Sequence, residues 1–76
     1  LTHYIAHRLA REARILGALG DEAVAEDALL PAAYGDVSRR VWPLALRSMR
    51  AHLYYLREQE RAVEARPRHW RRAQVG

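Results

Sequence analysis

The sequence contains no cysteine among its 76 residues. A disulfide framework and a zinc site built from thiolates are therefore excluded, and the composition fits a reducing compartment. The sequence also lacks any apolar run near the roughly 20 residues that cross a bilayer. No signal-peptide pattern opens it. These absences predict a cytoplasmic protein that makes no membrane contact.

Lysine is absent as well: all 13 basic residues are arginine, and the formal net charge is +4. A basic balance favours an anionic partner such as nucleic acid. Arginine without lysine, together with abundant alanine, is also what a GC-rich genome produces. The charge alone leaves both explanations open.

The stretch HYIAHRLAREARILGAL, residues 3–19, has the spacing of an amphipathic helix, yet only two residues precede it. The chain does not open on an initiator methionine. A chain of this length forms one domain with a small core. We therefore interpret residues 1–76 as a single domain cut from a longer polypeptide.

Apolar residues at helical spacing predict the first helix, which ends at Gly20. They are Ile5, Leu9, Ala13, Leu16 and Leu19. The stretch EAVAED, residues 22–27, is short enough to be a stub of strand. Asp27 is expected to cap a second helix, which ends at Gly35.

The third predicted helix is the longest and spans residues 43–60, since proline favours the first position of a helix. Its core-facing seam is predicted to consist of Ala45, Met49, His52, Leu53 and Leu56. Two strand-like runs, residues 61–65 and 69–73, enclose Arg66-Pro67-Arg68 and predict a hairpin with a basic tip. The predicted fold class is α+β: a winged helix-turn-helix with three helices followed by a two-stranded β-hairpin wing.

Several short motifs, in this order, resemble the segment after the catalytic domain in metallo-β-lactamase-fold hydrolases of the β-lactamase-like protein 2 group. The first helix carries His7-Arg8, Arg11-Glu12 and Ile15-Leu16. The second helix, LLPAAYGDV, ends in a tyrosine followed by an acidic loop. The third helix and the wing match at Pro43-Leu44-Ala45, Ser48, Ala51-His52-Leu53, Leu56 and Trp70. Trp42 departs from the pattern, since the family often has histidine before this proline.

The resemblance implies that the chain is the winged-helix domain from the C-terminal end of a larger hydrolase. In that family a catalytic domain precedes the winged helix and holds zinc or another divalent metal. The HxHxDH-type motif of that domain does not occur in this sequence. The chain alone is therefore expected to have no catalytic residue and no cofactor, whereas the full-length parent would be a metal-dependent hydrolase. Ribonuclease activity and thioester or ester hydrolysis both stay open for the parent.

The first helix offers a candidate docking surface for that missing domain, formed by His7, Arg8 and Glu12. On a helical wheel Glu12 falls near the middle of the apolar face, where a charge is costly unless it is paired. An internal salt bridge or a contact with the catalytic domain would pair it, and the two interpretations are compatible. His3 and His7 have a spacing that can bind zinc, but no nearby carboxylate or cysteine completes a metal site.

A second candidate surface is basic and would contact nucleic acid, with RNA as the expected partner. Arginine forks suit phosphate, and aromatic rings can stack on unpaired bases. The candidates are Arg47, Arg50, Tyr54 and Arg57 on the third helix and Arg66, Arg68 and Arg71 in the wing. A solvated face is the alternative. Trp70 is expected to be buried against the core, and His52 to donate to a backbone carbonyl.

The favoured function is that of an accessory domain, which packs on the catalytic domain of a hydrolase and shapes its substrate cleft or grips RNA. One alternative is a free winged-helix DNA-binding transcriptional regulator. Such a regulator needs a dimerisation element to match paired half-sites, and no helix is spare for one. A protein-interaction module is the other alternative.

Overall fold

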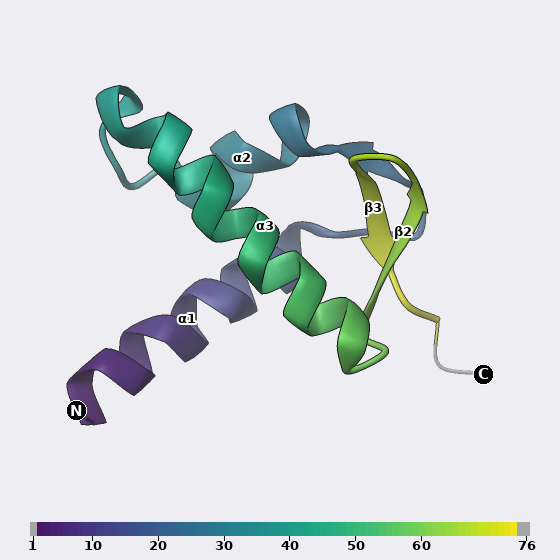
Figure 1. The fold of residues 1–76 in the computed structure, drawn as a ribbon, viewed down its shortest axis with the longest axis horizontal. Helices are drawn as coiled ribbons and strands as arrows, with labels where there is room; N and C mark the ends of the chain where they lie inside the picture. Colours follow the sequence, from purple (N-terminus) through teal and green to yellow (C-terminus); the bar gives the residue numbers. More distant parts are fainter. Residues whose placement is uncertain (1, 75–76) are drawn as a thin grey trace.

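The computed structural model describes residues 2–74, with side chains from residue 6 onward. The elements run, in order, α1 Thr2–Ala18, β1 Val24–Ala25, α2 Glu26–Tyr34, the 3-10 helix η1 Arg39–Val41, α3 Trp42–Glu58, β2 Ala62–Arg66 and β3 His69–Arg72 (Figure 1). The predicted order of three helices and a C-terminal hairpin is confirmed. The fold class is α+β, as a winged helix requires.

The start of α2 differs from the prediction. Ala25 occupies the N-cap position and makes no side-chain hydrogen bond, so the prediction that Asp27 caps this helix was wrong. The hairpin instead supplies a hydrogen-bond acceptor at the start of α2: the backbone N–H of Glu26 donates to the carbonyl of Arg68 at 3.0 Å. Asp27 lies in the first turn, where a carboxylate interacts favourably with the helix dipole.

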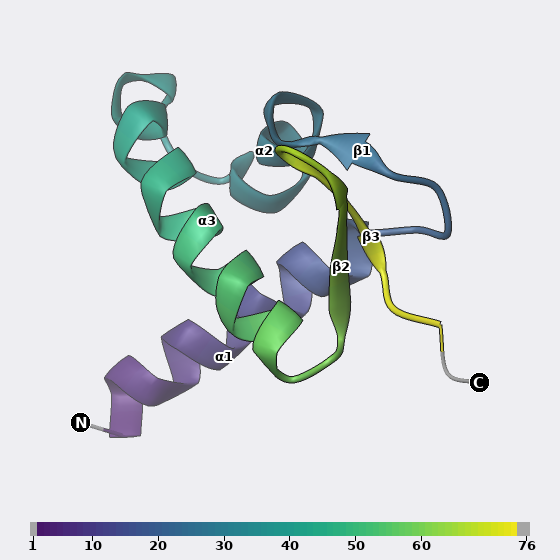
Figure 2. The same cartoon turned by 45° about the vertical axis from the view of Figure 1, so that its right-hand side comes forward.

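The predicted strand stub joins the wing. β1, β3 and β2 form one antiparallel sheet in that order, so β3 is the central strand (Figure 2). Trp70 of β3 lies opposite Val24 on one side and Glu64 on the other. The hairpin turn places Arg68 at a φ of 61°, and the Glu64 carboxylate accepts the backbone N–H of Arg68 at 3.0 Å.

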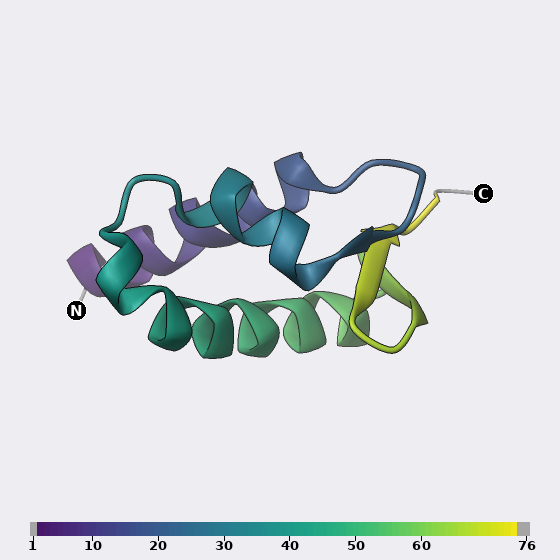
Figure 3. The same cartoon turned by 90° about the horizontal axis from the view of Figure 1, so that it is seen from above.

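The core lies where the three helices meet the sheet. Its buried side chains are Ile15, Leu19, Leu29, Leu30, Ala33, Tyr34, Ala45, Met49, Leu53, Leu56, Ala62 and Trp70. The predicted seam of α3 is confirmed at its apolar positions, and the predicted burial of Trp70 is confirmed with 0% exposure. Viewed from above, α3 lies on one side of α1 and α2, and the sheet closes one end (Figure 3).

The apolar stripe of α1 is only partly used. Ile15 and Leu19 are buried, but Leu9 is 60% exposed and Ala13 is exposed as well. Leu9 and Ala13 of the helical stripe therefore do not join the core, and the side chain of Ile5 lies outside the described residues. The N-terminal half of α1, which carries Leu9, extends past the other elements (Figure 1). In the described part of the chain, no helix is long and apolar enough to cross a membrane.

Candidate functional site

The buried carboxylate of Glu26 joins three elements at the base of the wing. Its side chain is 2% exposed. One carboxylate oxygen accepts from Nε of Arg50 on α3 at 2.7 Å, and the other accepts from Nε1 of Trp70 on β3 at 2.9 Å. The hydrogen bond to Glu26 raises the pKa of Arg50 above its ordinary value. Arg50, a candidate phosphate ligand, is thus held by an internal acid.

Arg57 and Tyr54 are also engaged inside the domain. Nη1 of Arg57 lies 3.1 Å from the Glu64 carboxylate of the wing. The same guanidinium lies over the Tyr54 ring at 5.0 Å and the Trp70 ring at 6.0 Å. The Tyr54 and Trp70 rings are 5.7 Å apart and tilted. These contacts stabilise the wing against the end of α3, so Arg57 carries little uncompensated charge toward a ligand.

The other candidate nucleic-acid residues lie elsewhere on the surface. Arg47 is exposed on α3, and Arg66 and Arg68 are exposed at the tip of the wing. Arg71 is half-buried and donates from its guanidinium to the carbonyl of Arg72 at 3.3 Å. The predicted basic surface is therefore divided: two of its arginines pair with Glu26 and Glu64, and the wing keeps most of the exposed charge.

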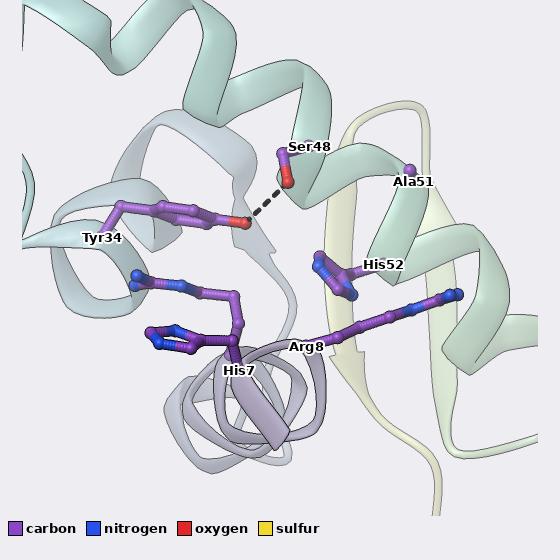
Figure 4. A pocket seen from close by; sticks show the side chains of 7 residues that line it. His7, Arg8, Tyr34, Ser48, Ala51 and His52 are labelled. Atoms are coloured by element: carbon purple, nitrogen blue, oxygen red, sulfur yellow. Dashed lines mark hydrogen bonds between the residues drawn. The ribbon is translucent and has the colours of Figure 1, made fainter. Parts of the chain in front are cut away.

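A cleft of about 410 Å³ separates α1 from α3, with the end of α2 at its floor (Figure 4). Its lining consists of His7, Arg8, Arg11, Tyr34, Ser48, Ala51 and His52. Two of the three docking candidates, His7 and Arg8, line it directly. The Tyr34 hydroxyl donates to Oγ of Ser48 at 3.3 Å across the floor.

Glu12, the third docking candidate, points into the domain. It is 6% exposed, and its carboxylate lies 3.1 Å from Nδ1 of His52 and 3.8 Å from Nε of Arg8. The imidazole N–H of His52 therefore donates to a carboxylate, and the prediction of a backbone carbonyl as its acceptor was wrong. The physical reason is that a carboxylate at a core-facing position of α1 needs a partner, and α3 supplies it.

Arg11 forms one wall of the cleft and was not among the predicted site residues. Its guanidinium lies over the Tyr34 ring at 4.4 Å and donates to both carboxylate oxygens of Asp36 at 2.7 and 3.0 Å. It also donates to the carbonyl of Ala33 at 2.7 Å, while Arg14 lies 3.1 Å from Asp36. The hydrogen bond from Arg11 lowers the pKa of Asp36 to about 2. The sequence signal for this wall was the position of Arg11 one turn after His7, on the same helical face.

Within residues 6–74, no three His, Cys, Asp or Glu side chains gather closely enough to hold a metal ion. The zinc spacing of His3 and His7 falls partly outside this range, because the side chain of His3 is not described.

The arrangement of α2, α3 and the wing defines a winged-helix domain. The chain belongs to the β-lactamase associated winged helix domain family, whose model matches residues 26–70, more than half of the chain. The match begins at Glu26 and ends at Trp70, so α1 and its docking candidates lie outside it. The comparison with curated proteins and the comparison with solved structures each gave no match.

Proposed function

We propose that this chain is the non-catalytic accessory domain of a metal-dependent hydrolase with a metallo-β-lactamase fold, working in the cytoplasm. The observation that carries the proposal is membership of a winged-helix family described as β-lactamase associated. The catalytic domain would hold the metal, which is zinc or another divalent ion. The metal would supply the hydrolytic chemistry. The residues of this chain take the supporting roles of packing and positioning.

The packing role is supported by the exposed part of α1. The N-terminal half of α1 extends past the rest of the domain (Figure 1), and His7 and Arg8 are exposed on it. Exposed side chains on a helix that projects past its own domain are suited to contact a second domain. In the proposed enzyme the winged helix packs on the catalytic domain and forms one side of its substrate cleft.

The RNA-gripping role rests on the wing rather than on α3. Arg66 and Arg68 are exposed at its tip, with Arg71 behind them on β3. Their guanidinium groups can donate to phosphate oxygens without breaking an ion pair with a carboxylate, unlike those of Arg50 and Arg57. The wing would guide a single strand toward the metal site without reading its sequence.

The test is an assay of the complete gene product beside residues 1–76 alone. Each is incubated with single-stranded RNA and with a panel of thioesters and esters, with and without a metal chelator. The complete product is expected to hydrolyse one of these classes in a chelator-sensitive way, and residues 1–76 to hydrolyse none. Metal-dependent cleavage by residues 1–76 alone, or a complete product inert toward every substrate, would contradict the proposal.

A further inference from the structure

One strip of the exposed surface of α3 carries apolar and aromatic side chains. Leu44 is 64% exposed, Tyr55 is 45% exposed, and Ala51 between them is exposed as well. With Ser48 these residues fall within an arc of about 60°, since each residue turns an α-helix by about 100°. We call Leu44, Ser48, Ala51 and Tyr55 the α3 ridge. Single exposed apolar residues are ordinary, but their alignment on one ridge indicates a contact surface.

The α3 ridge borders the cleft against α1. Ser48 and Ala51 line the cleft themselves, facing His7 and Arg8 across it (Figure 4). Arg8 reaches over the ring of Tyr55 at 5.6 Å and so joins the two sides at one end. The result is a groove whose α3 side combines Ala51 with the polar Ser48 and His52, and whose α1 side is basic.

The chemistry of the groove favours an acidic occupant. Its seven lining residues include no aspartate or glutamate. Arg8 is 52% exposed, and its contact with Glu12 is long at 3.8 Å, so its terminal nitrogens can bind a carboxylate. The Ser48 hydroxyl, which accepts from the Tyr34 hydroxyl, adds a donor on the α3 side of the groove.

The groove is a poor match for nucleic acid. A phosphate-binding surface needs several cations free of internal partners, because its affinity rests on counterion release. Asp36 offsets the charge of Arg11, and the Glu12 carboxylate pairs with His52. Arg47 is exposed on α3, one turn after Leu44. It forms no ion pair among the described residues. Tyrosine and arginine around an apolar anchor are instead typical of the core of a protein interface.

We infer that the groove between α1 and α3 is the docking site for the β-lactamase-fold domain, and that it receives an apolar side chain flanked by a carboxylate. The apolar group packs on Leu44 and Ala51, and the carboxylate pairs with Arg8. The inference rests on the proposed function, which supplies the partner. It adds that the helix in the recognition position of the winged helix binds protein.

The test introduces single cysteines, because residues 1–76 contain no native cysteine. Ala51→Cys places a thiol in the groove. Ala13→Cys is the matched control, an exposed alanine of α1 about 240° around the helix from His7. The rate of maleimide labelling at each position is measured by mass spectrometry in the complete gene product and in residues 1–76. Ala51→Cys is expected to react at least about tenfold more slowly in the complete product, and Ala13→Cys at an unchanged rate.

Two further variants test the chemistry of the contact. Leu44→Asp in the complete product should restore fast labelling of Ala51→Cys, while Leu9→Asp, on the opposite flank of α1, should not. Arg8→Glu should restore it as well. Equal effects of Leu44→Asp and Leu9→Asp would overturn the inference.

The failures of the two proposals are distinguishable. Protection at Ala13→Cys without protection at Ala51→Cys, in a product that still hydrolyses its substrate, overturns the docking site and leaves the accessory function standing. Absence of any metal-dependent hydrolysis by the complete product overturns the accessory function, and the docking site with it. Protection of Ala51→Cys in residues 1–76 by single-stranded RNA alone would assign the groove to nucleic acid and overturn the inference.

Discussion

Glu26 and Trp70, the first and last residues of the family match, are joined by a hydrogen bond of 2.9 Å from the indole N–H to the buried carboxylate. This bond ties the first residue of α2 to the central strand of the sheet. The same carboxylate binds Arg50 of α3 at 2.7 Å. One buried side chain at the start of α2 thus contacts both α3 and the wing.

Glu26→Ala is expected to destabilise the domain by about 2–3 kcal/mol, because it removes a hydrogen bond to a charged group and leaves a buried indole N–H unsatisfied. Glu26→Gln should cost less, since its amide oxygen still accepts from Trp70. Urea unfolding followed by tryptophan fluorescence measures both. A Glu26→Ala variant as stable as wild type would contradict the role of this contact.

Asp36 should make a stability contribution that depends on pH. Its folded-state pKa of about 2 lies below the ordinary 3.8, so the unfolded chain binds more protons between these values. The stabilisation is fully present above about pH 4 and is lost as the pH falls through about 2. The stability difference between wild type and Asp36→Asn should therefore be constant from pH 7 to about 4 and shrink below it.

Thermal unfolding across this pH range tests the Asp36 prediction, with Asp21→Asn as the control at an exposed aspartate outside the Arg11 pair. Carbon-13 NMR titration of the Asp36 carboxyl reads its pKa directly. Arg11→Ala should move that pKa back toward 3.8. A stability difference between wild type and Asp36→Asn that grows as the pH falls would contradict this prediction.

His52→Ala should destabilise the domain by about 1–3 kcal/mol, since it deprives a buried carboxylate of its closest hydrogen-bond donor. His52→Asn, which can place an N–H near the position of Nδ1, should recover part of the loss. A double-mutant cycle with Glu12→Ala isolates the pair. Additive losses in that cycle would show that the two side chains do not act together.

Binding of single-stranded RNA, if it resides in the wing, should be weak and fall steeply with salt. Each phosphate-contacting arginine removed, as in Arg66→Ala or Arg68→Ala, should flatten the logarithmic salt slope by about 0.7 for a single strand. Arg50→Ala and Arg57→Ala should alter stability more than slope, because these side chains pair with Glu26 and Glu64. Fluorescence anisotropy at several salt concentrations gives the slopes. No binding at low salt would remove nucleic acid from the proposed function.

The local features of the fold were predictable from the sequence, and its long-range partners were not. The period of α3, the proline at its start and the turn around Pro67 each act within a few residues. The acid that holds Arg50 lies 24 residues away, and the one that binds His52 lies 40 residues away. Spacing along one helix cannot reveal such pairs. Helical spacing likewise identified the apolar face of α1. It could not show that Leu9 lies beyond the elements that cover Ile15.

The candidate site was predictable to a similar extent. Residue type and helical position identified His7 and Arg8, which the structure places in one cleft. Arg11 and Tyr34 were missed because their stacking depends on how α1 crosses the end of α2. The division of the basic surface was also missed, since a helical wheel shows Arg50 and Arg57 without the acids that approach them from α2 and β2.

The central claim is that this winged helix serves a β-lactamase-fold hydrolase, and the most direct test is the sequence of the transcript upstream of the codon for Leu1. The account predicts an open reading frame continuous with that codon, which encodes a catalytic domain with an HxHxDH-type metal motif. A start codon immediately before Leu1, or an upstream domain without metal ligands, would contradict it.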